Sequence, residues 1–136
     1  MPKNLELARV LVVDDQLSSR LTLQTLLQAG GYAVDVAGSS AEAFLKLDEG
    51  QYELVLSEAE VGSPQAGVRV LSYARVKPYR PATAVVTAYQ ETKAGRYPAG
   101  DRQQVSINTE NVGALLGQVA ELIGMRAQRR ALRTGA

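Results

Sequence analysis

The chain has 136 residues, of which 46% are hydrophobic, and a formal net charge of +1, values typical of one soluble globular domain. It contains no cysteine and no histidine, which excludes disulfide bonds, thiol catalysis, histidine-based zinc sites, Ser-His-Asp triads and histidine phosphocarriers. No segment approaches the roughly 20 apolar residues that cross a bilayer, and the N-terminus lacks a signal-peptide pattern. We therefore expect a cytoplasmic protein without a membrane partner.

The charge is unevenly distributed along the chain. Four of the 15 basic residues are arginines that follow Gly124, where no acidic residue occurs. Residues 1–123 therefore carry 11 basic and 14 acidic side chains, a net charge of −3. We expect one domain over residues 1–124, followed by a basic helical tail or linker over residues 125–136.

The first predicted elements are a strand and a helix. Residues 9–13, RVLVV, form a continuous apolar run, which is typical of a strand buried on both faces of a parallel sheet. Two aspartates follow this strand. We expect Ser18 or Ser19 to cap the next helix, and Gly30–Gly31 to end it.

The middle of the chain repeats this alternation of strand and helix. Residues 33–37, AVDVA, have the composition of a short second strand. Ser39 and Glu42 have the spacing of a capping box, and the helix that they open is expected to end at Gly50. A third strand over residues 54–57 then leads to an acid, Glu58, and to a loop.

The following helix is marked by apolar residues on one face and by a proline at its end. Its predicted core positions are Val68, Leu71 and Ala74 or Arg75. The helix should end near Lys77-Pro78, because the residue before a proline avoids helical backbone angles.

The last third of the chain contains two predicted strands and one long helix. The strands cover residues 82–88 and 104–108. Residues 90–103 contain Gly95, Pro98 and Gly100, so we expect the fourth helix to be short or broken. The final helix is long and has one apolar face, made of Val112, Leu115, Leu116, Val119, Leu122 and Ile123.

Strands that alternate with helices through connections too long for hairpins predict βαβ units and an α/β fold. We expect a single five-stranded parallel sheet of the flavodoxin-like order 2-1-3-4-5, with helices on both faces. In such sheets, ligand sites lie beyond the carboxyl ends of the strands, where the strand order reverses.

Three acids are predicted to meet at that edge, namely Asp14, Asp15 and Glu58. Three carboxylates in one cleft repel one another unless a cation lies between them, and their hard oxygen atoms suit Mg²⁺. The alternative for Asp14 and Asp15 is an ordinary place in a loop. The chain has no Walker lysine motif and no GxGxxG, so the first turn does not have the pattern of a nucleotide phosphate site.

The segments VLVVDDQ, YAVDVAGSSAEAFLKL, YELVLSE and AVVTA resemble the receiver domain of two-component response regulators, over roughly residues 8–124. The resemblance implies a bacterial signalling protein of a phosphorelay. In that family, an acid pair after the first strand holds Mg²⁺, and an aspartate that ends the third strand accepts a phosphoryl group from a histidine kinase. A Thr or Ser after strand four and a Lys after strand five contact that phosphoryl group.

Three positions of this chain match the family pattern. Asp14 and Asp15 match the acid pair, and Thr87, followed by the small residue Ala88, matches the switch hydroxyl. The alternative for Thr87 is an ordinary threonine at a strand end.

Two positions depart from the pattern: Glu58 stands where the family has the phosphoacceptor Asp, and Asn108 stands where it has Lys. Glutamate is longer by one methylene, which moves the carboxylate by about 1.5 Å, and errors of about 1 Å can cost on the order of a hundredfold in rate. Loss of the lysine removes a cation that stabilises the transferring phosphoryl group. The alternative for Asn108 is a cap of the last helix.

The resemblance and its departures together predict a pseudo-receiver that is not an enzyme, in which Glu58 imitates the phosphorylated acid. Such a module would signal through a protein partner and would require no cofactor, with Mg²⁺ bound weakly at Asp14, Asp15 and Glu58. One alternative is a working Mg²⁺-dependent phosphoacceptor, and another is an α/β domain that senses a small molecule or metal. A homodimer is compatible with the sequence, whereas nothing favours nucleic acid. The arginine-rich end is either a solvated tail or a connector to an output domain.

Overall fold

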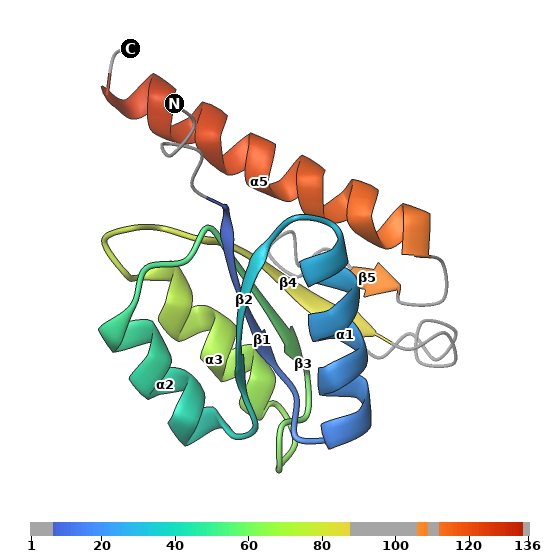
Figure 1. The fold of residues 1–136 in the computed structure, drawn as a ribbon. Helices are drawn as coiled ribbons and strands as arrows, with labels where there is room; N and C mark the ends of the chain where they lie inside the picture. Colours follow the sequence, from blue (N-terminus) through green and yellow to red (C-terminus); the bar gives the residue numbers. More distant parts are fainter. Residues whose placement is uncertain (1–6, 88–105, 109–111, 135–136) are drawn as a thin grey trace.

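The computed structural model describes residues 7–87, 106–108 and 112–134. Within them, the strands form one parallel sheet in the order β2-β1-β3-β4-β5 (Figure 1). The strands are β1 (Arg9–Val13), β2 (Ala33–Ala37), β3 (Leu54–Glu58), β4 (Ala82–Thr87) and β5 (Ser106–Asn108). The helices are α1 (Leu17–Ala29), α2 (Ser40–Glu49), α3 (Ala66–Arg75) and α5 (Val112–Thr134). The predicted α/β fold with a parallel sheet is confirmed.

Helices cover both faces of the sheet, with α1 and α5 on one side and α2 and α3 on the other (Figure 1). Each face has its own apolar cluster, and the strands contribute to both by alternation. In β1, Leu11 and Val13 pack with α2 and α3, whereas Val10 and Val12 pack with α1 and α5. All four side chains are buried, as expected for a strand that is covered on both faces.

The start of α1 differs from the prediction. The helix begins at Leu17, and its N-cap residue Gln16 makes no side-chain capping hydrogen bond, so neither Ser18 nor Ser19 caps it. Instead, the backbone N–H of Gln16 donates to Asp14 Oδ1 at 2.9 Å. The chain enters the helix directly after the acid pair, and the Asp14 carboxylate satisfies the backbone N–H of the N-cap residue itself.

The start of α2 confirms its predicted cap. Ser39 Oγ accepts a hydrogen bond from the backbone N–H of Glu42 at 3.1 Å. Glu42 Oε1 in return accepts from the N–H of Gly38 at 2.8 Å, one residue earlier than in a standard capping box.

The buried face of α3 is only partly as predicted. Leu71 and Ala74 are fully buried, but Val70 is buried in the core and Val68 is only partly covered. The helix ends at Arg75, close to the predicted stop before Pro78.

The long last helix is confirmed, because α5 has 23 residues. It runs through residues 124 and 125 without interruption, so the domain boundary predicted there stays a prediction. The fourth helix, predicted within residues 90–103, lies outside the described residues. None of the described helices is long and apolar enough to cross a membrane.

Candidate functional site

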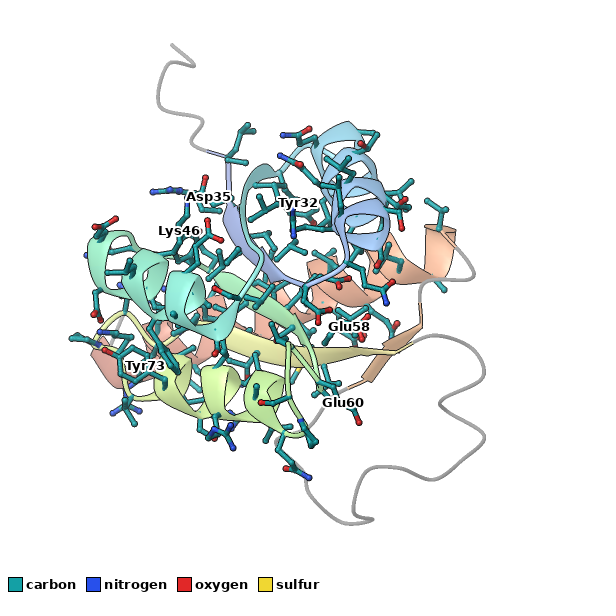
Figure 2. The ribbon with its side chains drawn as sticks, turned by 90° about the horizontal axis from the view of Figure 1, so that it is seen from below. Tyr32, Asp35, Lys46, Glu58, Glu60 and Tyr73 are labelled. Atoms are coloured by element: carbon teal, nitrogen blue, oxygen red, sulfur yellow. The ribbon has the colours of Figure 1, made fainter. Side chains whose placement is uncertain are left out.

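The acids predicted to form a site lie at the carboxyl ends of two neighbouring strands, on the same edge of the sheet. Val13, the last residue of β1, is the register partner of Ser57, and Glu58 is the last residue of β3. Glu58 is in turn the partner of Val86 in β4. Figure 2, which views the molecule from this edge, shows Glu58 and Glu60 on either side of the β4 ribbon.

Asp14 is the most enclosed of these acids. Its side chain is only 2% exposed, and one carboxylate oxygen, Oδ1, accepts the N–H of Gln16. Among the described residues, the other oxygen, Oδ2, is buried and has no hydrogen-bond partner. Arg20 Nη1 donates to the Asp14 backbone carbonyl at 3.0 Å, so its guanidinium lies on the backbone side of this residue. A buried carboxylate oxygen without a donor is costly, and a cation is one group that would satisfy it.

Asp15 is exposed and holds the loop between β3 and α3. Its Oδ2 accepts a hydrogen bond from the backbone N–H of Gly62 at 3.0 Å. Gly62 has φ of +80°, a left-handed conformation that favours glycine. The loop after Glu58 is therefore fastened to the acid pair after β1.

The backbone of Glu58, the last residue of β3, packs against the first turn of α3. The buried Ser57 Oγ donates to the Glu58 carbonyl at 2.8 Å, and the N–H of Gly67 donates to the Ala59 carbonyl at 2.8 Å. A Cβ atom added to Gly67 would lie 1.5 Å from the Glu58 carbonyl oxygen, so only glycine fits there. Sequence reasoning missed Ser57 and Gly67; the only signals were a serine inside an apolar run and a glycine in a first helical turn.

The switch and lysine positions are placed by the backbone. Thr87 ends β4, Asn108 ends β5, and the two are register partners. They therefore occupy the same edge of the sheet as Glu58. Ala88 lies outside the described residues.

The three predicted metal ligands do not form one cluster. Among the described residues, no group of three acidic side chains is arranged to hold a metal ion. Asp14 and Asp15 remain as a pair of adjacent carboxylates, and within the described part of the chain the buried Asp14 Oδ2 has no donor. Mg²⁺ is often bound by one or two carboxylates and several waters, and weak Mg²⁺ binding at the acid pair stays a prediction.

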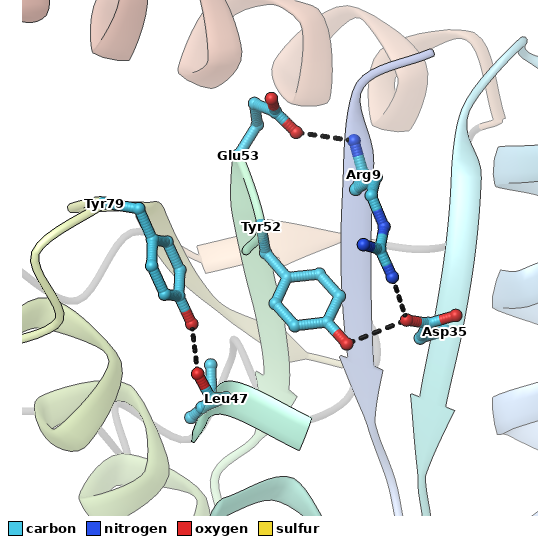
Figure 3. A network of polar contacts seen from close by, with 6 residues as sticks. All are labelled: Arg9, Asp35, Leu47, Tyr52, Glu53 and Tyr79. Atoms are coloured by element: carbon cyan, nitrogen blue, oxygen red, sulfur yellow. Dashed lines mark hydrogen bonds and ion pairs between the residues drawn. The ribbon is translucent and has the colours of Figure 1, made fainter. Parts of the chain in front are cut away.

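A second polar network lies at the opposite edge, where the strands begin (Figure 3). Asp35 Oδ2 accepts from Arg9 Nη2 at 2.6 Å and from the Tyr52 hydroxyl at 2.8 Å, and Glu53 Oε1 accepts the N–H of Arg9 at 2.7 Å. Burial opposes ionisation of Asp35, but the hydrogen bonds from Tyr52 and Arg9 outweigh it and lower the pKa of this carboxyl. Burial, followed by the bond to Asp35, raises the pKa of Tyr52. These groups satisfy one another, so the network is structural.

Comparison with known proteins identifies the family. A family model described as the response regulator receiver domain matches residues 10–97, more than half of the chain. No curated protein matches the sequence closely enough to serve as a relative.

The fold is also that of solved receiver structures. A CheY-like receiver domain protein from Methanospirillum hungatei has a TM-score of 0.74 and 23% identity, with 91% of this chain and 99% of that chain covered. The chemotaxis response regulator CheY4 of Vibrio cholerae has a TM-score of 0.66 and 21% identity, with 85% of this chain and 98% of that chain covered. NtrX from Brucella abortus, in complex with ADP, has a TM-score of 0.80 and 16% identity, with 93% of this chain and 29% of that chain covered. The chain belongs to the response regulator receiver domain family.

Proposed function

We propose that this receiver domain acts through a protein partner without being phosphorylated at position 58. The observation that carries the proposal is that β3 ends on Glu58, at the edge where the receiver pattern has an aspartate. Receiver domains act on output domains or other proteins, and a protein partner is therefore the expected target.

The packing of the Glu58 backbone against α3 supports the loss of phosphotransfer. A longer side chain could act like aspartate only if the backbone withdrew by about the length of one carbon–carbon bond, roughly 1.5 Å. The Glu58 carbonyl already lies where a Cβ on Gly67 would be, and Ser57 donates to it. The backbone has no room to move toward α3, so the glutamate carboxylate stays too far forward for an in-line transfer.

The sequence at the end of β5 supports the same conclusion. Asn108 is the last residue of β5, and an asparagine carries no charge. A phosphoryl group that transfers between oxygens gains most of its stabilisation from preorganised charges, so an uncharged residue at this position removes one of them. Mg²⁺ at Asp14 and Asp15 would neutralise charge at the same edge. It would not correct the extra length of Glu58 or supply the positive charge that is missing at Asn108.

The test is intact mass spectrometry after incubation with Mg²⁺ and a small-molecule acyl phosphate. We expect the natural protein to keep its mass, and the Glu58→Asp/Asn108→Lys variant to gain one phosphoryl group. A Glu58→Ala/Asn108→Lys variant is the matched control, because it has the lysine without an acceptor. Labelling of the natural protein that is lost in Glu58→Ala would instead identify a working phosphoacceptor, and the proposal would be wrong.

A further inference from the structure

The C-terminal half of α5 extends past the sheet. Figure 1 shows the helix crossing one face of the molecule and continuing beyond the start of β1. Its first half is anchored by Leu115 and Val119, which are fully buried, whereas most side chains from Gly124 to Leu132 are exposed. This outer half therefore needs a separate explanation, because it contributes little to the core.

One side of the outer half has the spacing of a helix-pairing seam. Leu122, Met125, Arg129 and Leu132 follow one another at intervals of three, four and three residues, the a/d spacing of a coiled coil. Leu122 is partly covered by the core, but Met125 is 45% and Leu132 is 80% exposed. We name these four residues the α5 seam.

A half-buried arginine, Arg126, fixes the rotation of this part of the helix. Arg126 Nη2 donates to the Tyr79 carbonyl at 2.7 Å, and its Nε donates to the Arg80 carbonyl at 3.0 Å. Each residue advances roughly 100° around a helix, so Met125 and Leu132 point roughly 100° to 120° away from Arg126. With Arg126 fastened to the loop between α3 and β4, Met125 and Leu132 point away from that loop, whereas Leu122 and Arg129 lie only about 40° and 60° from Arg126 around the helix.

The positive charge around the α5 seam favours an acidic binding partner. Residues 122–134 contain four arginines and no acid, and they place like charges three and four residues apart, which destabilises an isolated helix. Among the described residues, no salt bridge involves Arg129 or Arg130. In a pair of identical helices, arginines would face arginines in either direction, so a second copy is a poor partner. A helix that carries carboxylates beside its apolar residues complements both features.

We propose that the α5 seam binds an acidic amphipathic helix of a partner protein. Leucine-like side chains of that helix would cover Met125 and Leu132, and its carboxylates would pair with Arg129, which lies between these two residues on the seam. The flexible thioether of Met125 suits such a contact, because it adapts to differently shaped apolar partners. The inference rests on the proposed function in that both assign the domain a protein partner, but it does not depend on the chemistry of residue 58.

The test uses the full chain and a fluorescent three-heptad peptide with leucine at positions a and d and glutamate at e and g. We expect fluorescence anisotropy to show saturable binding, and a scrambled peptide of the same composition to bind about tenfold more weakly or worse, a difference of one decade in Kd. Met125→Ser/Leu132→Ser and Arg129→Glu should each weaken binding by a similar factor. The matched control is Arg69→Glu, which reverses an exposed arginine on α3 and should leave Kd unchanged.

Three results would overturn the inference. Equal binding of the ordered and scrambled peptides would mean that charge alone is recognised. Sedimentation of the natural protein as a dimer that Met125→Ser/Leu132→Ser converts to a monomer would make the seam a contact between copies. Binding of duplex DNA that is as tight as that of the peptide, and is lost in Arg129→Glu, would make it a nucleic-acid surface. None of these results bears on phosphorylation at position 58.

Discussion

At the scale of single residues, the candidate site depends on a glycine. Gly67 brings the first turn of α3 against the carbonyl of Glu58, and its own N–H binds the Ala59 carbonyl. Since a protein interior is packed to near crystal density, an added methyl group at this position has no space to occupy. The position of the Glu58 backbone is therefore set by a residue that takes no part in chemistry.

We predict that Gly67→Ala lowers the free energy of unfolding by about 3 kcal/mol or more, because the new methyl group must displace the backbone of β3. Urea denaturation measures the change. Gly117→Ala is the matched control: nothing lies within 4 Å of a Cβ added there, so the same substitution inside α5 should stabilise the protein by about 0.5–1 kcal/mol. Equal effects of the two substitutions would contradict this packing.

The network around Asp35 gives a prediction about pH. The pKa of Asp35 is lowered from its usual 3.8, so the unfolded chain takes up a proton before the folded protein does as the pH falls. The stabilisation from this carboxylate is complete above about pH 4 and declines as the pH falls through the folded pKa. The pKa of Tyr52 is raised, so its contribution is complete below about pH 10 and declines above it.

We predict that Tyr52→Phe lowers the free energy of unfolding by about 1 kcal/mol at pH 7, because it removes one hydrogen bond to a partly exposed carboxylate. The difference from the natural protein should shrink below about pH 4 and again above about pH 10. Urea denaturation at a series of pH values measures both limbs. Asp35→Asn alone and with Tyr52→Phe completes a double-mutant cycle, and a coupling of zero would show that the two groups act independently.

At the scale of elements, α5 is one continuous helix with two environments. Its first half packs on β4 and β5, and its second half is held by Arg126, whose guanidinium binds the carbonyls of Tyr79 and Arg80. Burial, then the nearby charge of Arg130, lowers the pKa of Arg126. The arginine-rich end was expected to be either a solvated tail or a connector, and this contact shows that its first arginine is anchored to the domain.

We predict that Arg126→Ala lowers the free energy of unfolding by about 1–2 kcal/mol, through the loss of two hydrogen bonds from a charged donor. It should also speed amide hydrogen exchange in residues 127–132. Arg130→Ala removes the same charge one turn later from an exposed position, and should change the free energy by no more than about 0.5 kcal/mol. If both variants exchange like the natural protein, Arg126 does not hold the helix.

At the scale of the whole molecule, the sheet divides its polar residues between two edges. The edge where the strands begin holds the satisfied network of Arg9, Asp35 and Tyr52, whereas the edge where they end holds Asp14, Asp15 and Glu58. Two apolar clusters between these edges fix the strands in register. Among the described residues, the buried carboxylate oxygen without a hydrogen-bond partner, Asp14 Oδ2, lies at the edge where the strands end.

We predict that about 10 mM Mg²⁺ raises the free energy of unfolding by less than about 0.5 kcal/mol, because a Kd of about 10 mM or weaker contributes RT ln 2 or less. Asp15→Asn should abolish this increase, while Glu60→Gln, which removes a charge near the same edge, should retain it. Thermal and urea denaturation with and without Mg²⁺ measure the effect. A several-fold larger stabilisation would indicate a tight site.

Much of the fold could be read from local patterns. The run VLVV, the Ser39–Glu42 spacing and the apolar face of α5 each predict an element that the structure contains, because burial on two faces, capping and helical periodicity are properties of short segments. The cap of α1 was predicted wrongly, because the sequence signal of two serines was followed instead of the local bond between Asp14 and Gln16. Val70 was missed on the buried face of α3, because its burial depends on residues of other elements.

The sequence by itself determined that an acid pair, a glutamate, a threonine and an asparagine stand at the ends of the first, third, fourth and fifth strands, since this depends only on chain order. The tertiary structure decided which of these groups act together. It tied Asp15 to Gly62 and fixed the Glu58 backbone against Gly67, and within the described part of the chain it places no three acids together as metal ligands. It also turned Arg126 toward the loop before β4. Each of these contacts joins residues from different elements, and distances across a fold are set by packing rather than by sequence spacing.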